Sequence, residues 1–191
     1  MDVVFTLQWP EFILANRLQE WLPKNKGFSV LVPASRQEKG IDLAVVRRNV
    51  NGGSRVVTLQ IKASRTYEQA APKRTTTKRF HFHTWFNRFD VPEEADFFLL
   101  FGMYALDASR TRRVGPEWYQ DCTLLFTQEE MKKFMSSCLT VGGTPDKMFG
   151  FGFNNKSKIV QTRGDSDRGF KDFTGWLLDN RVQLLKKALE T

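Results

Sequence analysis

Apolar residues recur at helical spacing between two prolines near the start of the chain, which predicts an amphipathic helix over residues 10–22. Residues 27–32 are then predicted to form a strand. Two runs rich in β-branched residues flank Asn51-Gly52-Gly53, and this turn signal predicts a β-hairpin over residues 41–62. The first third of the chain is therefore expected to fold as a helix, a strand and a hairpin.

The rest of the chain continues with strands and further helices. Residues 80–86 alternate apolar and polar positions and predict a strand with one exposed face, whereas the continuous apolar run 96–104 predicts a central strand buried on both faces. Shorter patterns predict strands at 122–126, 148–153 and 159–162 and helices at 127–138 and 171–189. This order predicts an α/β (α+β) fold in which helices flank a central mixed β-sheet, within a single domain spanning residues 1–191.

Composition and charge narrow the class of protein. Hydrophobic residues at 41% and charged residues at 26% are typical of a soluble globular protein. The net charge of +8 and the pI near 9.7 favour a polyanionic partner such as nucleic acid. Cys122 and Cys138 form no CxxC pair, so we expect reduced, buried thiols in a cytoplasmic protein. The N-terminal residues lack the pattern of a signal peptide, and no run approaches the about 20 apolar residues that span a bilayer, so no membrane partner is expected.

The polar residues of the predicted hairpin carry the candidate chemistry. Asp42 opens its first strand, and Gln60 and Lys62 stand two apart in its second strand, so these two share one face of the sheet. A carboxylate, an amide oxygen and an ammonium group can therefore converge at one end of an otherwise apolar hairpin. Each residue alone also has a simpler interpretation: Asp42 as a turn aspartate, and Lys62 as a lysine whose stem packs along an apolar edge.

This arrangement resembles the core of the PD-(D/E)XK nuclease superfamily, in the variant that has Gln in place of the acidic residue before X-Lys. Asp42 and the sequence Gln60-Ile61-Lys62 carry the resemblance. The predicted order of elements over residues 9–64 is similar to Mrr-type restriction endonucleases and Holliday-junction resolvases. The resemblance implies a restriction-endonuclease-like core and a metal-dependent DNA endonuclease of restriction, mobile-element or defence type. Nucleases of this size that cut both strands often act as dimers, so the family also suggests a homodimer.

The resemblance also implies roles for individual residues. Asp42, the amide oxygen of Gln60 and Glu11 of the first helix would hold Mg²⁺ or Mn²⁺. Lys62 would orient the attacking water or stabilise charge in the transition state. Glu11 equally fits a carboxylate that interacts with the helix N-terminus, and Glu20 is an alternative for the helix acid. Because glutamine replaces an acid at position 60, the alternative is a catalytically silent nuclease-like fold that binds nucleic acid or a protein partner.

A basic segment over residues 65–79 follows the predicted catalytic strand. Its cations are interleaved with threonine hydroxyls, a combination suited to phosphate contacts, although a solvated loop has the same composition. The candidate nucleic-acid-binding residues are Arg65, Lys73, Arg74, Lys78 and Arg79. Further on, His81 and His83 share a face of the next strand and could bind a metal, but a half-exposed strand face is favoured because the sequence offers no third ligand nearby.

Overall fold

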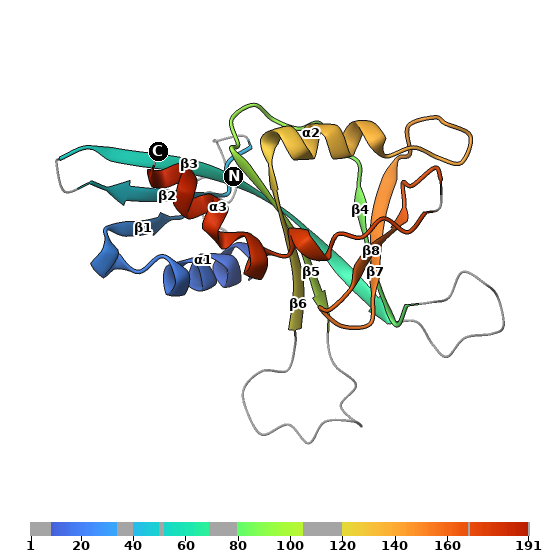
Figure 1. The fold of residues 1–191 in the computed structure, drawn as a ribbon, viewed down its shortest axis with the longest axis horizontal. Coiled ribbons are helices and arrows are strands. Elements are labelled where there is room, and N and C mark those ends of the chain that lie inside the picture. The colour runs from blue at the N-terminus through green and yellow to red at the C-terminus, as the bar shows by residue number, and fades with distance from the viewer. Residues whose placement is uncertain are drawn as a thin grey trace, which may run out of the picture.

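The structure is a computed structural model that describes residues 9–33, 40–49, 52–68, 80–104, 120–167 and 169–190. Its helices are α1 (Trp9–Trp21), α2 (Gln128–Ser137) and α3 (Leu178–Glu190). Its strands are β1 (Phe28–Leu31), β2 (Leu43–Arg48), β3 (Ser54–Glu68), β4 (Phe82–Asn87), β5 (Phe97–Tyr104), β6 (Gln120–Thr127), β7 (Met148–Phe153) and β8 (Ile159–Arg163). These elements, drawn in Figure 1, confirm the expected α+β class. Within the described ranges, no helix is long and apolar enough to cross a membrane.

One long strand, β3, joins the eight strands of the described chain into a single sheet. Its first half pairs antiparallel with β2, which pairs antiparallel with β1, and its middle pairs in parallel with β5. Its last residues pair with β4, which leads on to β7 and β8, while β6 pairs with β5. Figure 1 shows β3 crossing the molecule, with β1 and β2 at one end and β4, β7 and β8 at the other. The sheet is mixed, as expected.

The two faces of the sheet bury separate apolar clusters. Alternation along β3 sends Leu59 and Ile61 to one face, which α1 and α3 cover and which we call the α1/α3 face. Gln60 lies on the other face, beside Phe98 of β5, and Lys62 follows it there. Phe98 belongs to the second cluster, to which α2, β4, β7 and β8 contribute, so we call this the α2 face. The candidate residues of β3 therefore lie on the side of the sheet that carries α2.

The aromatic–glycine alternation in β7 has a packing cause. Phe149, Phe151 and Phe153 point into the cluster of the α2 face and are at most 1% exposed. Gly150 and Gly152 lie on the reverse side of the strand. The pairing of β7 with β8 shifts register between Gly150 and Phe151, which marks a bulge or an irregularity in the strand. The strand thus contributes rings to one face only and leaves the other face without side chains at its glycines.

The turn of the predicted hairpin is confirmed and sets the register of β2 against β3. The Asn49 N–H donates to the Gly53 carbonyl at 2.7 Å. Gly52 has a φ of 88°, a conformation that glycine adopts without a Cβ clash. With the turn closed in this way, Leu43 lies opposite Leu59.

Two further local features agree with the sequence. The Thr127 side chain accepts the Glu130 N–H, and the Glu130 carboxylate accepts the Thr127 N–H, which is the capping box that begins α2. Cys122 and Cys138 are free and buried, and burial raises the pKa of each thiol to about 12. Both thiols are therefore protonated and poorly nucleophilic at neutral pH.

The predicted start of the last helix is wrong. Apolar periodicity predicted a helix over residues 171–189, but α3 begins at Leu178. Before it the chain pairs with β8: the Phe173 N–H donates to the Ile159 carbonyl at 2.7 Å. Phe173 is 2% exposed, so it is a core residue that happens to stand at helical spacing from the apolar positions of α3. A backbone N–H that bonds across strands is not available to a helix, which delays the helix start.

Candidate active site

The register of the hairpin brings Asp42 to the segment of β3 that contains Gln60. Leu43, the first residue of β2, lies opposite Leu59, so Asp42 enters the hairpin at the level where Gln60 follows Leu59 on β3. The Asp42 N–H donates to the Leu59 carbonyl at 2.9 Å, which holds the two segments together beyond the end of β2. Lys62 follows Gln60 on the α2 face. The structure therefore brings these three predicted residues to one place.

That place is a section of β3 with one open edge. β2 pairs with β3 only as far as Leu59, and β4 begins to pair at Thr66. Between these points, among the described strands, β3 is paired only with β5 on its other side. We call this gap the fork, because β2 and β4 diverge from β3 at its two ends. At such an open edge the backbone groups of β3 have no strand partner, so a side chain or a ligand can approach them.

Asp42 has a structural contact at the fork. Its Oδ2 accepts the Ile61 N–H at 2.6 Å. Since β2 has ended at this level, the carboxylate takes the place of the backbone acceptor that a longer strand would supply. The turn-aspartate interpretation of Asp42 therefore has a definite contact, while Oδ1 receives no hydrogen bond from any described residue.

Gln60 is buried with an unsatisfied oxygen. Its side chain is 7% exposed, and Oε1 has no hydrogen-bond partner among the described residues. A buried polar atom without a partner costs about 1–3 kcal/mol. The chain tolerates this cost at the position where the resemblance implies a metal ligand, and an amide oxygen in this state accepts a cation or a donor readily.

We expect Gln60→Met to raise the free energy of unfolding by about 1 kcal/mol, because methionine fills a similar volume without an unsatisfied oxygen. Gln161 offers a matched control, since it is 3% exposed but its Nε2 donates to the Arg163 carbonyl at 3.2 Å. Gln161→Met should therefore lower stability. Urea unfolding monitored by circular dichroism compares the two variants. Equal destabilisation of both would show that the Gln60 amide is also satisfied in the folded protein.

Lys62 lies at the mouth of a cavity in the fork. Its Nζ is 5.1 Å from the ring centroid of Phe89, so the ammonium is held over an aromatic face. The cavity has a volume of about 330 Å³, and its lining includes Lys62, Ser64, Trp85 and Arg88. The Ser64 hydroxyl donates to the Trp85 carbonyl and closes one end of the fork. Two cationic residues around one polar cavity favour an anionic ligand such as a phosphate.

Glu11 stands in a different position from the other candidates. It lies in the first turn of α1 and is partly buried. α1 packs through Leu14, Ala15 and Leu18 against the α1/α3 face, so it covers the side of the sheet opposite to Gln60 and Lys62. The helix acid, whether Glu11 or Glu20, therefore stays a prediction.

The donors at the fork fit a hard cation in chemical type. Asp42 Oδ1 and Gln60 Oε1 are both oxygens without a described hydrogen-bond partner. Mg²⁺ prefers oxygen ligands and often uses one or two carboxylates while it keeps several waters. Within the described ranges, no group of three or more His, Cys, Asp or Glu side chains is arranged to hold a metal. The two oxygens therefore match this ion in chemical type, although Gln60 Oε1 is buried in this structure.

The basic segment is described only in part. The predicted start of the basic loop at residue 65 is wrong, because β3 continues to Glu68. Arg65 is exposed on this strand, whereas Lys73, Arg74, Lys78 and Arg79 lie outside the described residues. His81 Nε2 is 2.9 Å from the Glu68 carboxylate, and the His83 ring is stacked with Trp85 at 5.8 Å. Both histidines are partly exposed at β4, in agreement with the half-exposed strand face that the sequence favours.

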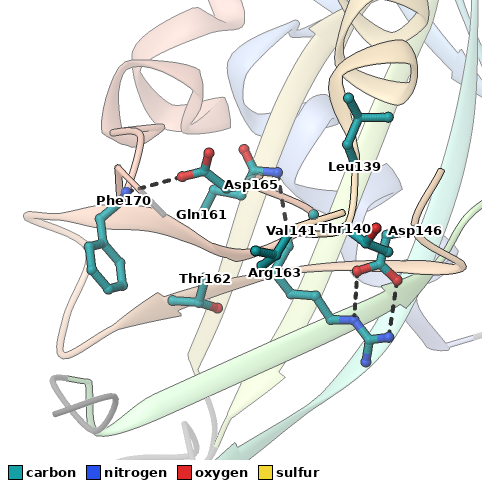
Figure 2. A pocket seen from close by; sticks show the side chains of 10 residues that line it. Leu139, Thr140, Val141, Asp146, Gln161, Thr162, Arg163, Asp165 and Phe170 are labelled. Atoms are coloured by element: carbon teal, nitrogen blue, oxygen red, sulfur yellow. Dashed lines mark hydrogen bonds and ion pairs between the residues drawn. The ribbon is translucent and has the colours of Figure 1, made fainter. Parts of the chain in front are cut away.

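A second cavity, of about 310 Å³, lies beside β8 and the turn that follows α2 (Figure 2). Arg163 and Asp146 form an ion pair across it at 3.0 Å. Asp165 accepts the backbone N–H of Phe170 at 3.1 Å. Its charged groups already have partners within the protein, and none of the candidate residues line it.

Sequence reasoning did not assign Ser64 or Arg88, two of the polar residues that line the fork cavity, to the site. Ser64 stands two positions beyond Lys62, so the same period-two argument would have placed it on that face. Arg88 follows β4 and comes to the cavity only through the pairing of β4 with β7.

The chain was also compared with known proteins. Comparisons with protein-family models, with curated proteins and with solved structures each found no match.

Proposed function

We propose that this chain is a metal-dependent DNA endonuclease that hydrolyses phosphodiester bonds on a restriction-endonuclease-like core. The observation that carries the proposal is the fork, where Asp42 bonds β3 at Leu59 and Ile61, on either side of Gln60, and Lys62 follows on the same strand. The order of α1 and the antiparallel strands β1, β2 and β3 agrees with the order of elements on which the PD-(D/E)XK resemblance rests.

Each residue of the fork has a role in this proposal. Asp42 and Gln60 would hold Mg²⁺ or Mn²⁺, which when bound polarises a phosphate and lowers the pKa of a water molecule. Lys62 orients the attacking water or stabilises the negative charge that develops on the phosphate oxygens. Arg88 and Ser64, which line the same cavity, help to position the phosphate. The net charge of +8 favours association with DNA at low salt.

Cleavage of plasmid and short duplex DNA in Mg²⁺ or Mn²⁺ tests the proposal. Asp42→Asn keeps an oxygen for the Ile61 N–H while it removes the charge, and Lys62→Met keeps the stem beside Phe89. Each variant is expected to cut about 100-fold or more slowly than the parent chain, with an unchanged fold by circular dichroism. EDTA should stop the parent reaction.

Matched surface variants separate this loss from a general effect of charge. Asp167→Asn and Lys158→Met change exposed residues elsewhere and should cut at the parent rate. Cleavage that survives both Asp42→Asn and Lys62→Met would place the activity elsewhere and refute the assignment of the fork.

A silent nuclease-like fold that binds nucleic acid is the second candidate function. It is favoured by the position of α1 and by the absence, among the described residues, of a cluster of three or more metal-ligating side chains. In this case the chain binds DNA with strong salt dependence, yet no Mg²⁺- or Mn²⁺-dependent cutting occurs. Gln60→Glu then tests whether the fork can hold a metal ion. The variant adds a second carboxylate, so calorimetry should detect stronger metal binding, whether or not cleavage follows.

A further inference from the structure

The far end of the sheet carries aromatic rings on the side turned away from the phenylalanine core. Tyr67 of β3 lies opposite His83 of β4, and Trp85 shares the face of His83. The ring centroids of Tyr67 and Trp85 are 5.1 Å apart, and those of His83 and Trp85 are 5.8 Å apart with an interplanar angle of 17°. Tyr67 is 51% exposed. We call these three residues the ring platform.

Two glycines of β7 allow rings to lie against the strand. Gly150 is opposite Trp85, and Gly152 is opposite His83. A Cβ at Gly150 would stand 2.3 Å from Cδ1 of Trp85, and one at Gly152 would stand 2.7 Å from Cδ2 of Phe80. The rings therefore occupy the space where side chains of β7 would otherwise stand. The indole lies against the backbone of β7 and stays partly exposed, next to the more exposed ring of Tyr67.

Positive charge lies next to the ring platform. Arg65 is exposed and shares the face of Tyr67 on β3. Trp85 also lines the fork cavity together with Lys62 and Arg88, so the platform and the cavity meet at Trp85, although Lys62 stands on the opposite face of β3. Burial lowers the pKa of His83, which keeps this ring uncharged at neutral pH. Aromatic rings for bases beside cations for phosphates are the combination with which proteins bind single-stranded nucleic acids.

We infer that the ring platform binds unpaired nucleotides, with bases stacked on Tyr67 and Trp85 and the phosphate backbone beside Arg65. The preferred ligand is therefore a single strand, or DNA with an unpaired segment, which leads from the platform to the fork cavity. A regular duplex cannot use the platform, because its base faces are covered by their neighbours. The inference rests on one part of the proposed function, namely that the partner of this chain is a nucleic acid.

Binding of a short labelled single-stranded oligonucleotide, followed by fluorescence anisotropy, tests the inference. The full chain carries Asp42→Asn and the buffer contains EDTA, so that cutting does not interfere. Tyr67→Ser removes an exposed ring and should weaken binding about tenfold, whereas Tyr67→Phe keeps the ring and should bind within about twofold of the parent. Phe12→Ser is the matched control, since its ring is 48% exposed on α1, away from the platform.

Tryptophan fluorescence gives an independent readout. Stacking of a base on Trp85 should quench its emission, so Trp85→Phe should remove most of the quenching that the oligonucleotide causes. Trp9→Phe, which replaces an indole that is 50% exposed on α1, should leave the quenching unchanged.

The inference is overturned if Tyr67→Ser binds the single strand as tightly as the parent chain. It is equally overturned if the matching duplex binds as tightly and loses as much on substitution, or if no oligonucleotide binds. These outcomes are distinct from those of the cleavage experiment. Single-strand binding without any cutting by the chain with Asp42 intact refutes the nuclease and leaves the platform. If the chain cuts DNA in a metal-dependent way and Tyr67→Ser binds the single strand as tightly as the parent chain, the platform is refuted and the nuclease is not.

Discussion

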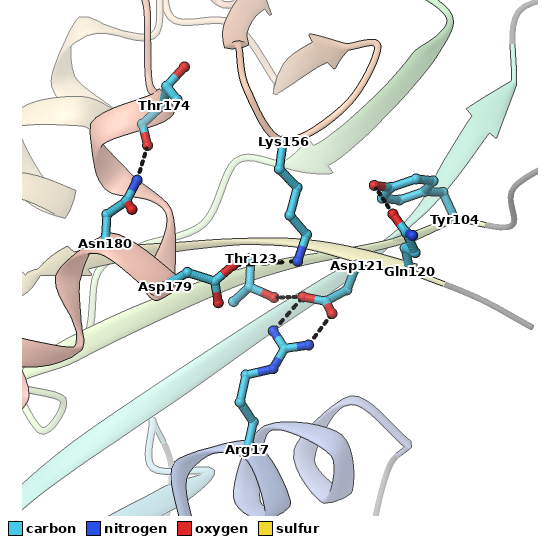
Figure 3. Close-up of polar contacts among 9 residues, drawn as sticks. All are labelled: Arg17, Tyr104, Gln120, Asp121, Thr123, Lys156, Thr174, Asp179 and Asn180. Atoms are coloured by element: carbon cyan, nitrogen blue, oxygen red, sulfur yellow. Dashed lines mark hydrogen bonds and ion pairs between the residues drawn. The ribbon is translucent and has the colours of Figure 1, made fainter. Parts of the chain in front are cut away.

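Replacement of Asp121 by alanine is expected to lower the free energy of unfolding by about 3–5 kcal/mol. Asp121 lies in β6 and is 3% exposed. Its two carboxylate oxygens receive the two Nη groups of Arg17 from α1, and the Thr123 hydroxyl donates to it at 2.5 Å. Figure 3 shows this cluster, in which the ion pair joins α1 to the sheet. Loss of the carboxylate leaves a partly buried guanidinium without its anion.

Urea unfolding of a small set of variants separates this charge effect from packing. Arg17 is 22% exposed, so its charge stays desolvated in Asp121→Ala. Removing both charges in Asp121→Leu with Arg17→Leu should recover part of the loss. Asp179→Ala is the control, because Asp179 is 44% exposed and 3.5 Å from Lys156, and an exposed pair contributes only about 0–1 kcal/mol. Equal losses for Asp121→Ala and Asp179→Ala would contradict the prediction.

The same ion pair predicts how stability depends on pH. Burial alone would raise the pKa of Asp121, but the hydrogen bonds and charge of Arg17, with Thr123, outweigh it and hold the pKa below its usual value of 3.8. A carboxyl with a lowered folded-state pKa contributes stability above the unfolded-state value and loses it as the pH falls through the folded-state value. The stability difference between the parent chain and Asp121→Ala should therefore be constant near neutral pH and shrink below about pH 4.

The fork shows which part of the site local sequence can predict. Alternation alone places Gln60 and Lys62 on one face, and the turn signal sets the register that brings Asp42 to the end of the paired part of β3. The open edge between Leu59 and Thr66 has no local signal, because it depends on where β2 leaves β3 and where β4 joins it. Long-range pairing of this kind is decided by the whole core.

Two other positions show the same limit of local patterns. The first-turn location of Glu11 followed from its helix, but its side of the sheet is set by the packing of Leu14 and Leu18 on the α1/α3 face. Asp121 stands just before the apolar run 122–126, and at such a position the sequence does not distinguish a buried acid from an exposed one. Its partner Arg17 is 104 residues away, so the ion pair has no local pattern.

Replacement of Gly150 by alanine is expected to lower the free energy of unfolding by about 1–3 kcal/mol, and valine by more. The new Cβ would stand 2.3 Å from Cδ1 of Trp85 and 2.8 Å from the backbone oxygen of Thr84. Neither neighbour is the end of a flexible side chain, so β4 or β7 must shift. Gly175→Ala is the matched control, because a Cβ at Gly175 would meet nothing within 4 Å and alanine there restricts the unfolded chain.

A double variant decides which contact causes the loss at Gly150. If the indole is the main obstacle, Trp85→Ala should absorb part of the cost of Gly150→Ala, and the two losses in thermal or urea unfolding will not add. If the Thr84 carbonyl is the obstacle, the two losses will add. In that case glycine is required at position 150 because of the close approach of the β4 backbone, and not because of the indole. Gly150→Ala should also weaken single-strand binding about as much as Tyr67→Ser does, because a displaced indole no longer offers its outer face. A stable Gly150→Ala variant with full binding would show that the ring does not lie against β7.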